Sequence, residues 1–468
     1  MELFGRHIIY SDVLEVNKSN IIEVLDSIKS THLTNRSEID VLYNYYKGKQ
    51  AILGRKKDVR PEICNRIVEN RANEIVSFKV GYLCGEPIQY ISRSGDSKVS
   101  ESVSALNDMM LADSKATKDK ELLEWQMIAG TAYRMVLVSD GDNNSPFELH
   151  TLDPRNTYVI RSSRIGHKVL AAGTYVIDSM GHETHSIYTP RLFIEVKGRN
   201  VLKAEPHSLG RVPIIEYPAN NARLGAFETV IPILDAINTV ASNRIDGVEQ
   251  FVQSLMKFVN CEIDSETFTE LQQLGAISIK SNDGQNADVE IMTQELNQQQ
   301  TQTLVDHMYQ TVLTITGMPN RNGGSSTSDT GAASLLRDGW SAAEARAKDS
   351  ELMFKRSEQE MLKVVLPICE TLAGVSLTLK DVETKFTRRN YENIQTKAQV
   401  LCEMLNNVKI DPKLAFSHCG MFTDAEEAYQ MSMAWYEKEQ KRLENQQKQT
   451  VKTGGSNPTD KTQAEKPV

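Results

Sequence analysis

The second half of the chain carries apolar residues every three or four positions, which is the period of an amphipathic α-helix. The first such stretch starts between Ala226 and Ile231, where Pro232 suits an opening helical turn. Its apolar residues recur at a mean spacing of about 3.5 positions and are Val230, Leu234, Ile237, Ala241, Ile245, Val248, Val252, Leu255 and Val259. This pattern predicts a helix whose apolar face packs against another helix along its whole length.

Two further helical stretches lie on either side of a polar loop. The first covers 297–316 and is expected to end at Gly317, because glycine accepts the left-handed conformation of a helix C-terminus. The loop 320–329 has no apolar side chain to hold it and is expected to be mobile. Thr330 is placed to cap the next helix, which would span about 60 Å if it continues unbroken to Gly374.

Helical signals also open the chain. Asn20 with Glu23, and Asn35 with Glu38, resemble capping boxes and predict two short helices. A longer helix is predicted over 62–80, directly after a proline. The segments that follow with helical character are 101–113 and 118–130.

Between Thr131 and Tyr217 the pattern changes to short runs of β-forming residues separated by turn residues. Residues 140–144 are rich in Asp, Asn and Gly and indicate a hairpin turn. The expected strands, including one before this region, are 88–91, 133–139, 147–152, 158–161, 169–177, 185–188, 192–196 and 214–217. Residues 1–222 are therefore predicted to form one α+β domain.

The predicted helices 226–259 and 297–316 enclose a compact insert, 260–296, with a strand, helix, strand, turn and strand pattern. After Gly374, the segments with strand character are 375–379 and 384–389, and those with helical character are 393–407 and 424–445. The tail from Gln446 has few aliphatic residues and is expected to be disordered. The predicted fold class is α+β and predominantly helical.

The length, net charge and cysteine content of the chain limit its possible functions. A length of 468 residues predicts about two to four sub-structures. The net charge of -9 argues against a protein that holds nucleic acid by neutralising phosphates. The six cysteines have no CxxC pairing, which favours free thiols over a disulfide or zinc framework. The sequence shows no secretory signal, and no apolar run is long enough to cross a bilayer.

Several motifs suggest chemistry but lack the residues it needs. Gly323 to Ser326 precede a helix, yet the lysine of a phosphate-binding loop is missing. His182 and His185 would point to opposite faces of a strand, so solvent exposure is favoured over a metal site. Cys419 beside His418 has no orienting group, which favours a packing role. We therefore expect no catalytic residues, metal or cofactor, and no enzyme activity.

The insert 260–296 is strongly acidic. It contains a single base, Lys280, and its carboxylates are Glu262, Asp264, Glu266, Glu270, Asp283, Asp288, Glu290 and Glu295. Such a surface steers a basic partner toward it. A solvated face explains the same residues equally well, so both interpretations stay open at this point.

The order of these elements resembles the portal protein of tailed bacteriophages, of the siphophage type. The resemblance covers about residues 40 to 440. Local stretches add to it, namely NRIV (65–68) with KVGYLCGEPI (79–88), LDPRNTY (152–158), SNRIDGVEQF (242–251) and TGMP (316–319). The chain departs most from the family pattern in its Ser- and Gly-rich loop after Pro319.

The resemblance implies a portal fold arranged around a central channel. Its parts would be the wing (1–222, the long helix 331–374 and the segment 375–392), the stem (223–259 and 297–316), the clip (260–296), the tunnel loop (317–330), the crown (393–445) and a disordered tail (446–468). The clip would carry the acidic docking residues, and the tunnel loop would meet DNA in the channel. The tunnel-loop residues concerned are Asn320, Arg321, Asn322, Gly323, Gly324, Ser325 and Ser326.

The same resemblance implies a function. Portal proteins form rings of about twelve copies at one capsid vertex, through which double-stranded DNA passes during genome packaging and ejection. The implied partners are the terminase large subunit, head-tail connector proteins, and the major capsid and scaffolding proteins, with no membrane involved. The protein would belong to the virion and assemble in the cytoplasm of the host bacterium.

Two other functions remain as alternatives. One is a helical scaffold or adaptor protein without a DNA pore, which electron microscopy would distinguish because a portal shows rings with a central hole. The other is an enzyme that uses the Gly323 loop as a phosphate site, which a nucleotide-binding assay would detect.

Overall fold

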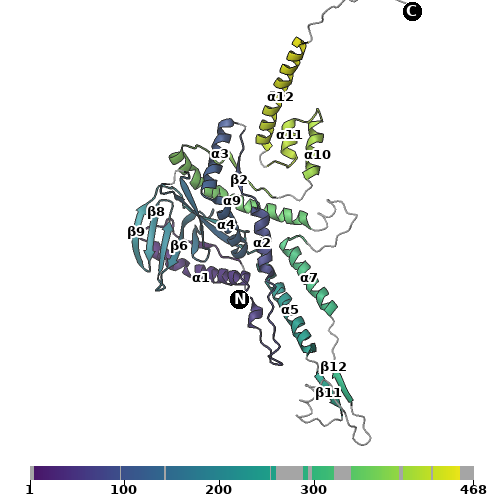
Figure 1. Ribbon diagram of the computed structural model, residues 1–468. Helices are drawn as coiled ribbons and strands as arrows, with labels where there is room; N and C mark the ends of the chain where they lie inside the picture. Colours follow the sequence, from purple (N-terminus) through teal and green to yellow (C-terminus); the bar gives the residue numbers. More distant parts are fainter. Residues whose placement is uncertain are drawn as a thin grey trace, which may run out of the picture. The chain divides into compact units, whose positions relative to one another are not determined.

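The computed structural model shows a mixed α+β protein with more helix than strand (Figure 1). It forms a large compact unit, Met1–Gly85 with Met109–Gly374, and a small one, Glu86–Asp108 with Val375–Val468. The residues that the structure describes are 5–94, 96–141, 144–252, 255–259, 288–292, 298–320, 339–388, 394–422 and 425–453. Side chains are not described at 250–259, 288–292, 298, 394–396 and 446–453.

A six-stranded sheet of order β1-β5-β6-β7-β8-β9 forms one layer of the large unit. β1 pairs parallel with β5, and the other neighbours pair antiparallel. The strands are β1 (Ile9–Ser11), β5 (Thr157–Ser162), β6 (Val169–Ile177), β7 (Glu183–Tyr188), β8 (Leu192–Lys197) and β9 (Asn200–Pro206). The sequence pattern predicts the middle four. It misses β1, which is three residues long, and β9, which is mostly exposed and shows no clear alternation.

A three-stranded antiparallel sheet of order β10-β3-β4 packs against one face of the first. All three of its strands are predicted from the sequence, and they are β10 (Ile214–Pro218), β3 (Thr131–Val138) and β4 (Phe147–Leu152). Val159 of β5 and Ala172 of β6 share an apolar cluster with Met135 and Ile214. Because side chains alternate along a strand, the neighbours of Val159 face the other way.

Helix α1 (Ile21–Tyr46) covers that other face, where Ile21, Val24 and Ile28 pack with Tyr158 in the main apolar cluster. The prediction of two short helices here is wrong, since α1 runs straight through the second supposed cap. That cap residue, Asn35, instead accepts a hydrogen bond from the His7 amide at 2.8 Å and donates one to the His7 carbonyl at 2.9 Å. Its polar group thus has tertiary partners in the middle of a helix. Glu38 likewise pairs with Arg6, at 2.9 Å.

Three more helices of the large unit pack on the smaller sheet or on each other. α4 packs against β3, β4 and α2, and α9 packs against β10 and β3. Their bounds are α2 (Arg71–Cys84), α4 (Lys115–Ala129) and α9 (Trp340–Ala373), with short 3-10 turns η1 (Ala51–Gly54) and η2 (Glu228–Val230). α9 contains Pro367 and ends at Gly374, which takes the left-handed φ of +68°.

A cluster of charged side chains, here called the buried quartet, holds α4, β3 and α9 together. Lys115 Nζ lies 2.6 Å from Asp119 and 2.8 Å from Glu358. Arg134 lies 2.6 Å from Asp119 and 3.7 Å from Glu358, and the Tyr217 hydroxyl donates to Glu358 at 2.7 Å. None of the four charged side chains is more than 3% exposed. Two positive and two negative charges therefore neutralise each other inside the core.

Two of the predicted helices have different bounds in the structure. The helix expected at 62–80 is α2, which starts only at Arg71, and residues 64–70 form an irregular segment. The helix expected to reach Val259 ends at Val252, and a strand follows it. Both errors arise where contacts with a distant segment or a paired strand replace the helical backbone bonds that the local pattern favours.

The small unit contains the antiparallel pair β2 (Gln89–Ser92) and β13 (Val382–Lys385), and Asn107 bonds to both backbone groups of Tyr90. Its helices include α10 (Ile394–Leu405), α11 (Pro412–His418) and α12 (Ala425–Thr453), and α3 (Ser97–Ala112) spans the boundary between the units. The expected strand 375–379 does not form, and α12 continues eight residues into the tail that was expected to be disordered.

The sequence pattern also misses α11, although its start has a recognisable signal. Asp411 accepts a hydrogen bond from the Lys413 amide at 2.8 Å, and Pro412 occupies the first helical position.

The candidate reactive residues of the described segments are structural. Cys419 is buried, and its thiol lies against the Phe416 carbonyl, which agrees with the packing role predicted for it. His182 is largely exposed as expected, but His185 is mostly buried and hydrogen-bonds to the Tyr158 hydroxyl at 3.0 Å. Five cysteines in the described part of the chain are free thiols. No helix in that part has the length and apolar character required to cross a bilayer.

Candidate functional site

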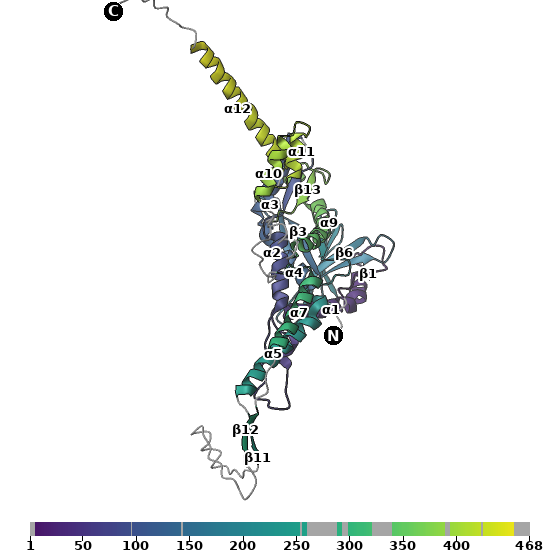
Figure 2. The same cartoon turned by 90° about the vertical axis from the view of Figure 1, so that its right-hand side faces the viewer.

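The candidate site is built on two neighbouring helices of the large unit and on the strand pair that connects with them. α5 (Ile231–Val252) and α7 (Gln298–Thr316) lie side by side, and β11 (Leu255–Val259) pairs antiparallel with β12 (Asp288–Met292) beyond their ends (Figures 1 and 2). α7 has nearly the bounds predicted from the sequence.

The irregular segment 65–69, here called the strap, lies along α5. The amide of Asn65 donates to Asp246 at 2.8 Å, and that of Ile67 donates to Ser242 at 2.9 Å. The amide of Glu69 donates to Asn238 at 2.9 Å. Alternate amides of the strap thus bond side chains four residues apart on α5, and the two segments run in opposite directions.

The spacing of these contacts has a geometric reason. Four residues of an α-helix rise by roughly 6 Å. Two residues of an extended chain advance by roughly 6.6 Å. A polar side chain at every fourth helix position therefore meets every second amide of an extended strap. The helical alternative for residues 65–69 would lose these bonds, which explains why α2 starts after the strap.

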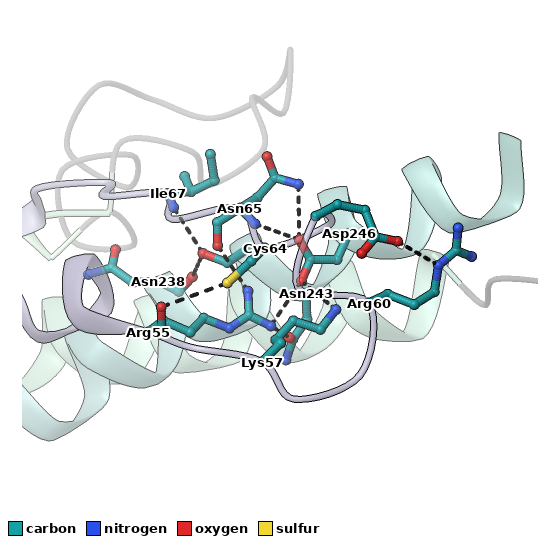
Figure 3. Close-up of polar contacts among 11 residues, drawn as sticks. Arg55, Lys57, Arg60, Cys64, Asn65, Ile67, Asn238, Asn243 and Asp246 are labelled. Carbon is teal, nitrogen blue, oxygen red and sulfur yellow. Dashed lines mark hydrogen bonds and ion pairs between the residues drawn. The ribbon is translucent and has the colours of Figure 1, made fainter. Parts of the chain in front are cut away.

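Asp246 receives the densest set of contacts (Figure 3). Its carboxylate accepts from both the backbone and the side-chain nitrogen of Asn65, at 2.8 and 2.9 Å, and lies 3.0 Å from Arg55 and 3.1 Å from Lys57. Burial alone would raise the pKa of Asp246. The Asn65 and Lys57 hydrogen bonds and the charge of Arg55 outweigh burial and lower that pKa below its usual value. Asp246 is therefore ionised at neutral pH and holds the strap through charge.

Replacing Asp246 by alanine should open the strap without unfolding the large unit. The change leaves the Asn65 amide and two cations without their acceptor, which costs about 2–3 kcal/mol of local stability. Hydrogen exchange of the Asn65 and Ile67 amides should accelerate about 30-fold to 150-fold, as measured by mass spectrometry or NMR. Equal exchange rates in the variant and the wild type would contradict this role.

The matched control is Glu249→Ala, which removes an exposed carboxylate from the same helix and should leave the strap amides unchanged. Acid should reproduce the effect of Asp246→Ala in the wild type. Because folding lowers the pKa of Asp246, its contribution is present above the unfolded value of about 3.9 and is lost as the pH falls through the folded value. The alanine variant should lack this acid-dependent step.

α7 is held to α2 by a stacked cation. The Arg71 guanidinium lies 4.3 Å from the centre of the Tyr309 ring, and the Tyr309 hydroxyl donates to Glu74 at 2.8 Å. Arg71 also bonds Glu74, at 3.0 Å. An open groove of about 380 Å³ lies beside this contact, and Asn320 is part of its lining.

Pro319 and Gly339, which follow α7 and precede α9, lie close together. Gly317 ends α7 with φ +68°, and the Met318 amide bonds the Leu313 carbonyl at 2.9 Å, as predicted for a helix that stops at this glycine. On the other side, Gly339 has φ +78°, and a Cβ built on it would lie 3.8 Å from the Pro319 Cα. The C-terminal end of α7 and the N-terminal end of α9 therefore lie next to each other.

The exposed and buried faces of α5 and α7 are not arranged as the apolar pattern predicts. On α5 the buried face includes Asn238, Ser242 and Asp246, which bind the strap. Two apolar residues of the predicted packing face of α5, Ile245 and Val248, are instead 39% and 42% exposed, and on α7 the apolar residues Leu304 and Ile315 are 50% and 42% exposed. The first turns of α5 do bury their apolar residues. The single chain therefore leaves part of this face uncovered, and its packing against another helix along the whole length stays a prediction.

α7 also has an unusual charge composition. Its 19 residues contain no Lys or Arg, and Asp306 is its only acidic residue. The exposed positions carry mainly neutral polar side chains, among them Gln299, Thr303 and Thr314. α7 thus presents a surface that has no fixed positive charge.

Most of the predicted site residues fall outside the part of the chain that the structure describes. Asn320 is described and half-buried, whereas Arg321, Asn322, Gly323, Gly324, Ser325 and Ser326 lie outside the described residues. Of the acidic residues, Asp288 and Glu290 lie on β12 opposite Val259 and Lys257. Glu262, Asp264, Glu266, Glu270 and Asp283 lie outside the described residues. The functions assigned to both sets stay predictions.

Sequence reasoning missed the strap and its acceptors on α5. A signal was present, because Asn238, Ser242 and Asp246 recur at intervals of four residues and so form one polar stripe on a helix. Their partners could not be identified, since the strap lies more than 165 residues earlier in the chain.

Comparison with known proteins decides the family. The sequence profile described as "Phage portal protein, SPP1 Gp6-like" matches residues 25–453. The chain belongs to this family of phage portal proteins. The predicted resemblance is thereby confirmed, and this portal protein is a bacteriophage virion component of a structural rather than enzymatic class.

A solved structure titled "Virion of native gene transfer agent (GTA) particle" contains a chain similar to this portal protein. The two share 11% sequence identity over 83% of this chain and 99% of that one, with a TM-score of 0.44. This similarity is too low to carry an argument. Among curated proteins, no sequence matches this chain.

Proposed function

We propose that this portal protein forms a ring at one capsid vertex, through which double-stranded DNA passes during packaging and ejection. The observation that carries the proposal is the pair formed by α5 and α7. Its exposed surface combines uncovered apolar residues with a helix that has no Lys or Arg. Family membership supports a capsid-embedded oligomeric ring.

The uncovered apolar residues fit contacts between copies. Ile245 and Val248 on α5, and Leu304 and Ile315 on α7, leave two exposed apolar positions on each helix. Covering such side chains is favourable by about 25 cal/mol per Å² removed from water. Neighbouring copies in a ring would supply the partner surface that a single chain lacks.

The neutral polar surface of α7 fits a channel wall. A DNA duplex carries one negative charge per ~1.7 Å of length, and each phosphate that a protein neutralises makes binding tighter and more salt-dependent. A wall with lysines or arginines would bind the duplex and slow its passage. α7 offers hydroxyl and amide groups, which exchange hydrogen bonds with water readily and hold no fixed positive charge.

The remaining parts have proposed roles within this ring. The tunnel loop (317–330) would touch the DNA backbone transiently through Asn320, Arg321 and Asn322. The acidic clip would bind the terminase large subunit during packaging and the head-tail connector proteins afterwards. Assembly in the host cytoplasm with capsid and scaffolding proteins would precede both steps.

Adding lysines to α7 tests the channel role. In Thr303→Lys with Thr314→Lys, two exposed positions become basic. Purified rings should then bind a duplex more tightly, and the slope of log K against log salt should steepen by about 0.9 for each phosphate that a new lysine neutralises. Packaging in a reconstituted motor assay should slow. The neutral control Thr303→Gln with Thr314→Gln should leave both quantities unchanged.

Two outcomes would contradict the proposal. One is an unchanged salt dependence in the lysine variant, and the other is a purified protein that shows no ring with a central hole by electron microscopy. The latter would favour a scaffold or adaptor without a pore. In the same assay, charge reversal of Glu262, Asp264 and Glu270 should stop packaging by removing motor docking while leaving the ring and its DNA binding intact.

A further inference from the structure

An open cleft of about 850 Å³ lies in the large unit, away from the α5 and α7 pair. Residues of β1, β5 and β10 line one side, and residues of α9 line the other. Five of the lining side chains are Lys or Arg and two are Glu. The cleft is therefore basic in a chain whose net charge is -9.

The floor of the cleft holds a cluster of ion pairs around one carboxylate. Glu216 pairs with Arg161 at 2.8 Å and with Arg223 at 2.6 Å, and its side chain is only 7% exposed. The carbonyl of Glu216 accepts a hydrogen bond from Ser357 on α9 at 2.8 Å. One carboxylate thus meets two guanidinium groups, which leaves one positive charge in excess.

The rim carries further positive charge. Lys168, Arg211 and Arg356 are exposed, and none of them forms an ion pair or side-chain hydrogen bond with the described residues. The other acidic residue of the lining, Glu360, already pairs with Lys363. These three cations come from three separate segments of the chain and line one cleft. Ion pairs within this unit do not neutralise them.

The walls between the charges are apolar. Val169, Val212 and Met353 are partly exposed along the cleft, and Ile214 is buried behind them. The ring of Tyr10 lies 5.0 Å from that of His167 at the same edge and is 41% exposed. A ligand for this cleft needs negative charge and aliphatic groups together.

We propose that this cleft binds an extended acidic segment of a partner protein, in which Asp and Glu alternate with aliphatic residues. An extended chain places successive side chains on opposite sides, so one set reaches the rim cations while the other packs on the apolar wall. A DNA duplex fits less well, because its phosphates lie on a convex surface and do not enter a recess with two glutamates. The proposal does not depend on the channel role.

The test uses the full-length protein and a fluorescein-labelled peptide of about twelve residues, ~40 Å when extended, alternating Asp or Glu with Val or Leu. Fluorescence anisotropy at physiological salt should show saturable binding. Arg211→Glu with Arg356→Glu should weaken it at least about tenfold, because two rim attractions become repulsions. A peptide with Asn and Gln in place of Asp and Glu should bind correspondingly weakly.

The matched control is Lys49→Glu with Lys120→Glu, which makes the same charge change at exposed residues outside the cleft and should bind within about twofold of the wild type. An equal loss in this control, or no saturable binding to the wild type, would overturn the proposal. Tighter binding of an oligonucleotide than of the acidic peptide would assign the cleft to nucleic acid. A changed subunit number in Arg211→Glu with Arg356→Glu, measured by sedimentation, would assign it to contacts between copies.

Discussion

Replacing Arg134 by methionine should destabilise the large unit by about 3–5 kcal/mol, the largest effect that we expect from a single substitution in this chain. Arg134 is 0% exposed and faces both carboxylates of the buried quartet. Without it, Asp119 and Glu358 share only Lys115, and one negative charge stays in the core without compensation. Chemical denaturation followed by circular dichroism measures the loss.

The ionisation of the quartet supports this expectation. Burial is the largest single influence and would lower the pKa of Arg134. Electrostatic interactions with Asp119, Tyr217 and Glu358 and the hydrogen bond to Asp119 together outweigh it and raise that pKa above its usual value. Burial and the charge of Glu358 raise the pKa of the Tyr217 hydroxyl, which therefore stays protonated and donates to Glu358. The network thus holds two complete ion pairs, and removing a single member leaves an unbalanced charge.

The control for this prediction is Arg199→Met. Arg199 also forms an ion pair, 2.6 Å from Asp26, but its side chain is 80% exposed. Its loss should change the stability by less than about 1 kcal/mol, because water screens and solvates both partners. If the two arginine variants lose the same stability, burial of the quartet does not matter and the prediction fails.

Replacing Ile245 and Val248 together by aspartate should abolish ring assembly while each chain stays folded. Both residues are about 40% exposed in the single chain, so the change costs little within it. In a subunit contact, each loses about 1 kcal/mol of apolar burial, and the new carboxylate must also be desolvated. Every contact of the ring is affected alike, so the losses accumulate around it.

Analytical ultracentrifugation measures this outcome as a shift from a ring to single chains, and circular dichroism reports whether the helices persist. The control is Thr239→Asp with Asn243→Asp, which adds the same charge to the opposite side of α5 and should assemble normally. Rings of normal size in the Ile245→Asp and Val248→Asp double variant would show that this face is not a subunit contact.

The sequence predicted the elements whose causes are local. α7 is recognisable from its apolar period and from Gly317, because helix period and left-handed termini depend on residues within one or two turns. The strands β3 and β4 and the hairpin between them follow from β-forming runs on either side of a polar turn. The motifs in their order also predicted the portal family, which the profile match confirms.

Predictions failed where distant groups replace local ones. Asn35 looked like a helix cap, but the backbone of His7 satisfies its amide, so α1 continues through it. The segment before Arg71 looked helical, but side chains of α5 accept its amide hydrogens. The deciding partner lies 28 residues away in the first case and up to 181 residues away in the second. Both separations are longer than the stretch of sequence from which a helix is predicted.

The sequence by itself determined that the chain is an acidic, mainly helical α+β portal protein, whose helix before Gly317 bears no Lys or Arg. Charge, period and glycine position depend only on the order of the residues. The tertiary structure alone decided that α5 buries its polar stripe and exposes Ile245 and Val248, and that four charges neutralise each other in the core. A side chain's partner is fixed only when distant segments pack together, because that packing decides which polar groups lose water and which apolar groups keep it.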